Sequence, residues 1–297
     1  MFKAIKKIIS WLAEHTILVL IGLLVSGITT FVVGIVNLFS AKKKNAKAIE
    51  IRDNAIKKYE EKNNQANDTL SRLGETKNQV IKSFDDFSDA IERIQNRPTV
   101  NKKIFKHGIP EYKLEEFKKL SNEWNNILVG AGGAAAGAIA GLAAYGFALP
   151  AAGPAVFVAG VAICARGVGL NKKAANNIKE AKTIEKEVDS IIAFYNELID
   201  YTDRLNDALC SLFEIYSSYL DRTKRLVLIK TDWKDFSREE KKVVTNAVKL
   251  ASILYMMCQI QVVVKPDSEN ELESVNKAEI KKIIDISKKN SNEAIGE

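Results

Sequence analysis

The sequence has few of the residues that build disulfide frameworks, metal centres and tight turns. Its 297 residues include three cysteines, two histidines and five prolines. Cys164, Cys210 and Cys258 show neither a pairing pattern nor a metal-ligand spacing, which argues against a disulfide scaffold and a structural zinc site. Each cysteine lies on an apolar helical pattern, so we expect buried thiols in a reducing compartment. The scarcity of proline leaves room for long helices.

The chain also lacks a strong excess of one charge. It carries 44 Lys and Arg against 37 Asp and Glu, a net charge of +7. Such an excess suits nucleic acid or an anionic membrane surface. Acidic and basic residues alternate along the helical stretches, however, as on a solvated surface. We therefore expect no nucleic-acid partner, and the sequence indicates no cofactor.

Residues 17–39 contain no charge and predict a transmembrane helix. At 1.5 Å per residue this helix reaches about 34 Å, enough for a hydrocarbon core of about 30 Å. The segment is longer than a signal peptide's apolar region and ends at Phe39, where a cleavage site needs a small residue. Residues 1–16 are predicted to form a basic interfacial segment. Three Lys or Arg precede the span and seven follow it, which places the bulk of the chain in the cytoplasm.

Two long stretches, residues 42–97 and 171–230, predict helices with one apolar seam each. The first seam contains Ile49, Arg52, Ile56, Tyr59, Asn63, Ala66, Leu70, Leu73, Lys77, Val80, Phe84, Phe87, Ile91 and Ile94. The second seam contains Ala181, Ile184, Val188, Ile191, Tyr195, Leu198, Thr202, Leu205, Leu209, Leu212, Tyr216, Tyr219, Thr223 and Leu226. An antiparallel coiled coil within one chain covers both seams, and pairing with a second copy is the alternative.

The segments outside the two long helices and the predicted membrane segments are shorter. Residues 98–126 are predicted to be a connector. Residues 231–265 are predicted to be a packing helix, which begins at a capping box made by Ser237 and Glu240. Residues 266–297 are predicted to be a polar tail that holds one short amphipathic helix before a loose end.

Between the two long helices, residues 127–170 are rich in Gly and Ala and carry no charge before Arg166. Small residues recur on one helix face every four or seven positions, a spacing that favours close helix packing in lipid. These residues are Gly133, Gly137, Gly141, Gly153, Gly160 and Gly167. Pro150 and Pro154 would break a continuous helix, so a hydrophobic helical hairpin with arms 127–149 and 155–170 is predicted.

Two other interpretations apply to this stretch. Gly130, Gly132 and Ala135 fit a loose dinucleotide fingerprint, but no convincing strand precedes them and no acidic residue follows at the right distance. The hairpin could instead be buried against the rest of the protein. Arg166 would have to snorkel or pair if the second arm enters a bilayer. Membrane insertion, permanent or conditional, and burial both remain open.

The order of parts carries a family resemblance. "GAGGAAAGAIAGLAAYG", followed by "NKKAANNIKEA", resembles bacterial glycine-rich helical-hairpin membrane proteins that are often labelled loosely as chemotaxis proteins. The organisation is also similar to apolipoprotein L and to pore-forming colicin domains, in which a hydrophobic hairpin enters the membrane. The resemblance covers about residues 45–230 and implies membrane interaction without catalysis. The uncleaved anchor departs from the colicin pattern.

These observations predict an all-α protein with an N-terminal transmembrane helix, a long antiparallel coiled coil and an Ala/Gly-rich hairpin. The expected function is that of a non-enzymatic protein of the bacterial inner membrane whose hairpin perturbs or permeabilises the bilayer when triggered. An antiphage or stress-defence effector would fit. The alternative is a membrane-anchored coiled-coil scaffold or sensor. The expected partners are the lipid bilayer and either further copies of the chain or a cytoplasmic protein.

Overall fold

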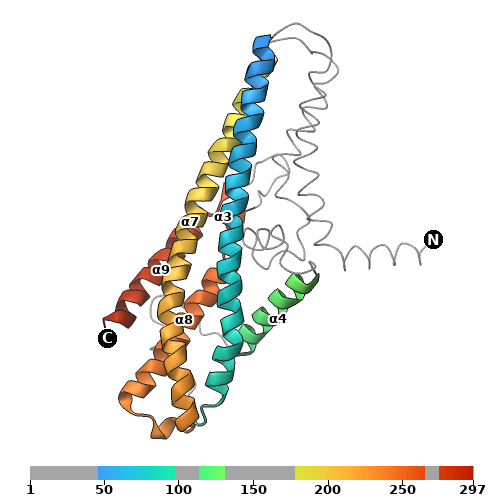
Figure 1. Cartoon of the computed structure of the whole chain (residues 1–297). Coiled ribbons are helices and arrows are strands. Elements are labelled where there is room, and N and C mark those ends of the chain that lie inside the picture. The colour runs from blue at the N-terminus through green and yellow to red at the C-terminus, as the bar shows by residue number, and fades with distance from the viewer. Residues whose placement is uncertain (1–45, 98–113, 131–177, 265–273, 297) are drawn as a thin grey trace, which may run out of the picture.

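A computed structural model describes residues 46–97, 114–130, 178–264 and 274–296. This part of the chain is mostly helical, as predicted (Figure 1). In chain order the elements are α3 (Ala46–Glu92), α4 (Leu114–Gly130), α7 (Ile178–Ile229), a 3-10 turn η2 (Trp233–Asp235), α8 (Arg238–Gln259), β1 (Val263–Val264), β2 (Ser274–Val275) and α9 (Lys277–Ile295). The strands form one short antiparallel pair. The two long seam helices, α3 and α7, form the centre of the body, and the other described helices pack against them.

The long helices α3 and α7 run parallel, side by side, from one end of the body to the other (Figure 1). In the pairs of residues that touch, a higher residue number in α3 goes with a higher residue number in α7. Tyr195 Oη donates to Asn63 Oδ1 at 3.0 Å near the first end. Farther along, the partners of Arg72 and Asp86 in α3 are Asp203 and Lys224 in α7, with N–O distances of 3.0 and 2.7 Å.

The predicted antiparallel orientation of this pair is therefore wrong, and α4 supplies the reason. α4 packs antiparallel to α3: Lys118 Nζ lies 2.8 Å from Glu92, and the Ser121 hydroxyl donates to Asp85 at 2.9 Å. This helix returns the chain along α3 before α7 begins. The prediction that residues 98–126 are only a connector missed this return, although Leu114, Phe117, Leu120 and Trp124 have helical apolar spacing.

The predicted seams are buried where the helices meet. Every residue of the first seam from Tyr59 in α3 to Ile94 just after it is buried, including the polar residues Asn63 and Lys77. In α7 the seam is buried from Leu198 through Tyr216. Beyond Tyr216 the buried positions are Leu220, Thr223 and Val227, so Thr223 is buried as predicted, whereas Leu220 and Val227 take the places predicted for Tyr219 and Leu226.

The body has a thin end and a thick end. At the thin end, residues 46–62 of α3 and 178–195 of α7 form a two-helix stalk whose core is a small cluster of Ala55, Tyr59, Val188 and Ile191. At the thick end α4 and α8 join the pair around a larger core. Phe117 of α4 makes edge-on ring contacts with Phe84 and Tyr255, with centroids 5.0 and 5.1 Å apart.

The C-terminal region is more ordered than the sequence predicts. The short helix expected around Ile280, Ile283 and Ile284 exists, and these three side chains are buried. The predicted polar tail with a loose end is wrong, however, because α9 continues to Ile295 and packs along α7. Tyr219 Oη donates to the carbonyl of Ala294 at 2.7 Å, which fixes the last turn of α9.

Candidate functional site

The residues predicted to carry function lie outside the part of the chain that the structure describes. This holds for the glycine rows, for the turn prolines and for the hairpin charge: Gly133, Gly137, Gly141, Gly153, Gly160, Gly167, Pro150, Pro154 and Arg166. It also holds for the predicted segments 1–16 and 17–39. Within 46–97, 114–130, 178–264 and 274–296, no helix combines the length and apolarity needed to cross a membrane. The glycine packing face remains a prediction.

The described residues do show how the hairpin region is entered. Residues 127–130, the first four of the predicted hairpin, are the last turn of α4. The stretch "EWNNILV" is therefore helical, and the strand that a dinucleotide fingerprint requires before its glycines is replaced by a helix. This agrees with the rejection of nucleotide binding on sequence grounds.

α4 is held on the bundle by a buried face and two polar contacts. Phe117, Leu120 and Trp124 are each at most 3% exposed. Trp124 Nε1 donates to Asn78 Oδ1 at 3.0 Å, and Ser121 bonds Asp85 as described above. The helix that leads into the Gly/Ala region is thus docked firmly on α3 through large apolar side chains.

The two ends of the 131–177 region attach to the body at different heights. Trp124 is level with Asn78 of α3, whereas Tyr195 of α7 is level with Asn63. Counted from these two contacts at a rise of 1.5 Å per residue, Gly130 at the end of α4 and Ile178 at the start of α7 lie about 40 Å apart along the axis. Figure 1 shows the same offset between the upper end of α4 and the first turn of α7. Residues 131–177 have to bridge it.

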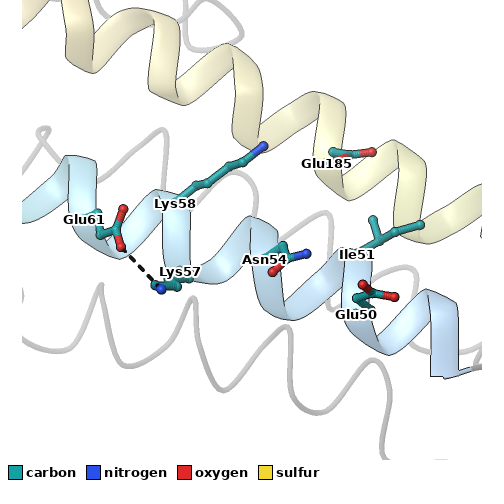
Figure 2. Close-up of a pocket in the computed structure, with 7 residues that line it drawn as sticks. All are labelled: Glu50, Ile51, Asn54, Lys57, Lys58, Glu61 and Glu185. Carbon is teal, nitrogen blue, oxygen red and sulfur yellow. Dashed lines mark ion pairs between the residues drawn. The ribbon is translucent and has the colours of Figure 1, made fainter.

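The stalk carries a shallow polar groove of about 470 Å³ between α3 and α7. Figure 2 shows its lining, six residues of α3 and one of α7: Glu50, Ile51, Asn54, Lys57, Lys58, Glu61 and Glu185. Lys57 pairs with Glu61 at 3.9 Å, and both side chains are largely exposed, so the pair adds little stability. The groove is a mixed-charge surface with no assembled catalytic group.

One polar residue of the predicted first seam, Lys77, lies buried in the long helix pair. Lys77 is fully buried on α3, and its ammonium donates to the carbonyl of Ile260 at 3.0 Å, at the end of α8. Burial lowers the pKa of Lys77 to about 8, while the nearby Cys258 raises it slightly. Burial also raises the pKa of the Cys258 thiol to about 12, so this thiol is protonated and unreactive at neutral pH.

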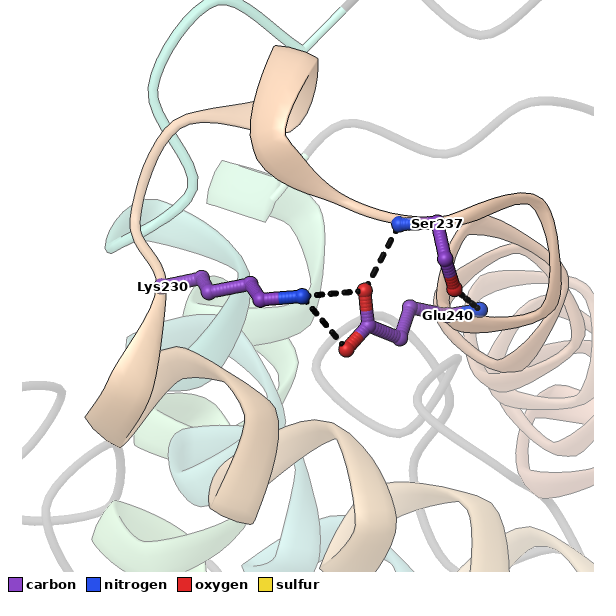
Figure 3. A network of polar contacts seen from close by, with 3 residues as sticks. All are labelled: Lys230, Ser237 and Glu240. Carbon is purple, nitrogen blue, oxygen red and sulfur yellow. Dashed lines mark hydrogen bonds and ion pairs between the residues drawn. The ribbon is translucent and has the colours of Figure 1, made fainter.

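The thick end of the body is closed by a rigid turn between α7 and α8 (Figure 3). The predicted capping box is confirmed: Ser237 Oγ accepts from the Glu240 amide at 3.2 Å, and Glu240 accepts from the Ser237 amide at 2.6 Å. Lys230 Nζ donates to both carboxylate oxygens of Glu240, at 2.9 and 2.8 Å. These bonds hold the pKa of Glu240 below its ordinary value, with the lysine contact the largest cause.

In the described part of the chain, no group of three or more His, Cys, Asp or Glu side chains is arranged to hold a metal ion. Comparisons with protein-family models, curated proteins and solved structures give no match to this chain. The resemblance to glycine-rich hairpin proteins therefore remains an expectation from the sequence.

Proposed function

We propose that this chain is a non-enzymatic protein of the bacterial inner membrane, anchored by residues 17–39, whose hairpin at 127–170 permeabilises the bilayer when triggered. The helical body stands on the cytoplasmic side, and its α3–α7 stalk works as a parallel coiled coil. An antiphage or stress-defence effector is the biological role that fits such an activity.

One observation carries the proposal: the parallel orientation of α3 and α7. α3 begins at Ala46, soon after the predicted anchor, and α7 begins at Ile178, soon after the predicted hairpin. In a parallel pair these two starting points lie at the same end. Lys42, Lys43 and Lys44 precede the first helix, and Lys172 and Lys173 precede the second. Basic residues next to membrane segments favour an anionic cytoplasmic surface.

The position of α4 on α3 supports conditional rather than permanent insertion as part of this proposal. Gly130 lies about 40 Å from the stalk end along the axis, by the rise of 1.5 Å per residue. Crossing that distance in extended chain takes about 12 residues at 3.3–3.6 Å each. Those residues would have to be taken from the first hairpin arm, and the rest of that arm would be too short to cross a bilayer. With the stalk upright, the full hairpin therefore reaches the membrane only after α4 leaves its place on α3.

The experiment is membrane depolarisation after induction in living cells, followed with a potential-sensitive dye. Wild type should depolarise the cells. Gly137→Leu places bulk at the centre of the Gly133–Gly141 row and should abolish depolarisation while the protein stays expressed and membrane-bound. Ala135→Leu adds the same side chain on the opposite helix face and should retain activity.

The competing function is a membrane-anchored scaffold or sensor. It predicts that wild type never depolarises cells under induction, phage challenge or other stress, and that Gly137→Leu leaves partner binding intact. That result would replace permeabilisation with scaffolding. Orientation is tested separately, because cysteines introduced near Lys57 and Lys230 should escape an impermeant reagent added to intact cells.

A further inference from the structure

The thick end of the body exposes apolar side chains. Leu228 and Ile229, at the end of α7, are 74% and 81% exposed, and among the described residues these are the large hydrophobic side chains left open to solvent. Beside them a groove of about 250 Å³ lies between α7 and α8. Its lining is Arg222, Arg225, Leu226, Ile229, Glu239, Glu240 and Val243.

This apolar surface, which we call the end patch, stands on a fixed support. The amide of Lys230 donates to the Leu226 carbonyl at 2.9 Å, so α7 keeps its helical bonding to the last turn. The amide of Gln95 donates to the Thr231 carbonyl at 2.7 Å, which ties the end of α3 to the same turn. The exposure of Ile229 therefore does not come from a frayed helix end, and a preformed surface loses little entropy on binding.

The charges around the end patch are divided between its two sides. Arg222 and Arg225 lie on the α7 side, and Glu239 lies on the α8 side. Arg222 stacks over the Tyr219 ring at 5.6 Å. Within the described part of the chain, neither Arg225 nor Glu239 has an ion-pair partner. The groove lining thus offers two arginines on the α7 side, an apolar centre, and the carboxylate of Glu239 on the α8 side, next to Glu240, which Lys230 already neutralises.

We propose that a second copy of this chain docks on the end patch about a two-fold axis. When the two-fold axis runs along the groove between α7 and α8, the α7 side of one copy meets the α8 side of the other. Arg225 then faces Glu239 of the second copy, twice per dimer, while Ile229 enters the groove beside Leu226. A patch of one charge would repel its own copy, but this patch complements itself.

The test is cross-capture of two differently tagged full-length copies extracted from membranes. Wild type should capture wild type. Arg225→Glu alone and Glu239→Arg alone should each lose self-capture by at least about tenfold, because like charges then face each other across the interface. The double variant should regain it. Mixing the two single variants should also restore capture, since every facing pair then has opposite signs.

The matched control is Lys282→Glu, which reverses the charge of an exposed side chain on α9, away from the end patch. This variant should leave self-capture unchanged. Ile229→Asp should abolish capture, and thermal melting of each variant should match wild type. The proposal is overturned if wild type fails to capture itself, or if capture survives both single reversals, as it would when the copies meet through the hairpin. It is also overturned if the reversals release a different protein and leave self-capture intact.

Discussion

Locking α4 to α3 should silence the protein reversibly. Ser121 Oγ and Asp85 Oδ2 lie 2.9 Å apart, so Ser121→Cys with Asp85→Cys puts two thiols at the α3–α4 contact. A disulfide needs its sulfurs at about 2.0 Å, and a short bis-methanethiosulfonate reagent bridges a longer gap. The cross-link joins α4 to the bundle covalently. If the hairpin reaches the bilayer only after α4 leaves, the locked protein cannot permeabilise.

The energy to be overcome can be estimated from the α4 contact. Burying each of Phe117, Leu120 and Trp124 stabilises the docked helix by about 1.5–3 kcal/mol, or about 5–9 kcal/mol together as an upper estimate. Removing the largest side chain with Trp124→Ala costs about 3–5 kcal/mol. At the low end this raises the released fraction roughly 100-fold. Trp124→Ala should therefore act in the opposite direction to the lock and lower the threshold for depolarisation.

The assay uses full-length protein reconstituted in anionic vesicles that hold a potassium diffusion potential. Cross-linked protein should leave the potential intact, and adding reductant to the same vesicles should collapse it. Each single-cysteine variant, treated identically, controls for reactions at the native thiols. Equal leakage before and after reduction would refute α4 release, and it would indicate instead that the body lies flat on the membrane with α4 still docked.

Three further variants test the body itself. Leu205→Ala with Leu209→Ala removes two fully buried seam residues and should lower the free energy of unfolding by about 2–5 kcal/mol per site in chemical denaturation, whereas exposed Asp207→Ala should not. Because the pKa of Lys77 falls from 10.5 to about 8 on folding, the unfolded chain binds more protons at this site between these values, and the Lys77 contribution to stability should rise by about 3 kcal/mol from pH 8 to 10.5. The raised pKa of Cys258 acts in the opposite direction above the ordinary thiol value, so the Lys77 contribution is read as the difference between wild type and Lys77→Met. In Lys77→Met this rise should vanish in the same denaturation series. Ser237→Ala removes one half of the capping box and should cost about 1 kcal/mol, measured by thermal melting.

The seams were predictable because a repeated apolar spacing determines which helix face is buried, whatever the partner. Their relative direction was not predictable, since an a/d pattern can pair with a parallel or an antiparallel neighbour. The information lay in α4, where Phe117 and Trp124 have the spacing of a buried helix face within a stretch interpreted as a connector. Because the helix α4 was not recognised, one pass of the chain along the body was missed, and α7 was therefore predicted to run antiparallel to α3.

The C-terminal helix was predicted too short for a different physical reason. Ile280 to Ile286 gave an apolar signal, but the buried face continues through Ser287 and Asn290, which are 2% and 0% exposed. Asn290 Nδ2 donates to the Ile286 carbonyl at 2.7 Å, which satisfies the amide nitrogen of a side chain that hydrophobicity would assign to solvent, while its buried Oδ1 has no hydrogen-bond partner within the described residues. The end patch gave no separate signal either, because Leu228 and Ile229 belong to the apolar stretch at the end of α7 and their exposure cannot be read from the sequence.

The parallel pair also limits how a signal could reach the hairpin. Ala46 and Ile178 start at the thin end, whereas the end patch lies at the thick end, where α4 also begins beside Glu92. Docking a second copy at the end patch would touch α7 and α8, and α8 shares the Phe117–Tyr255 ring contact with α4. A ligand shifts an equilibrium only by binding one state better than the other. Association at the end patch can therefore reach α4 through the packing of Tyr255, and Tyr255→Leu should weaken the coupling between docking and α4 release while leaving self-capture intact.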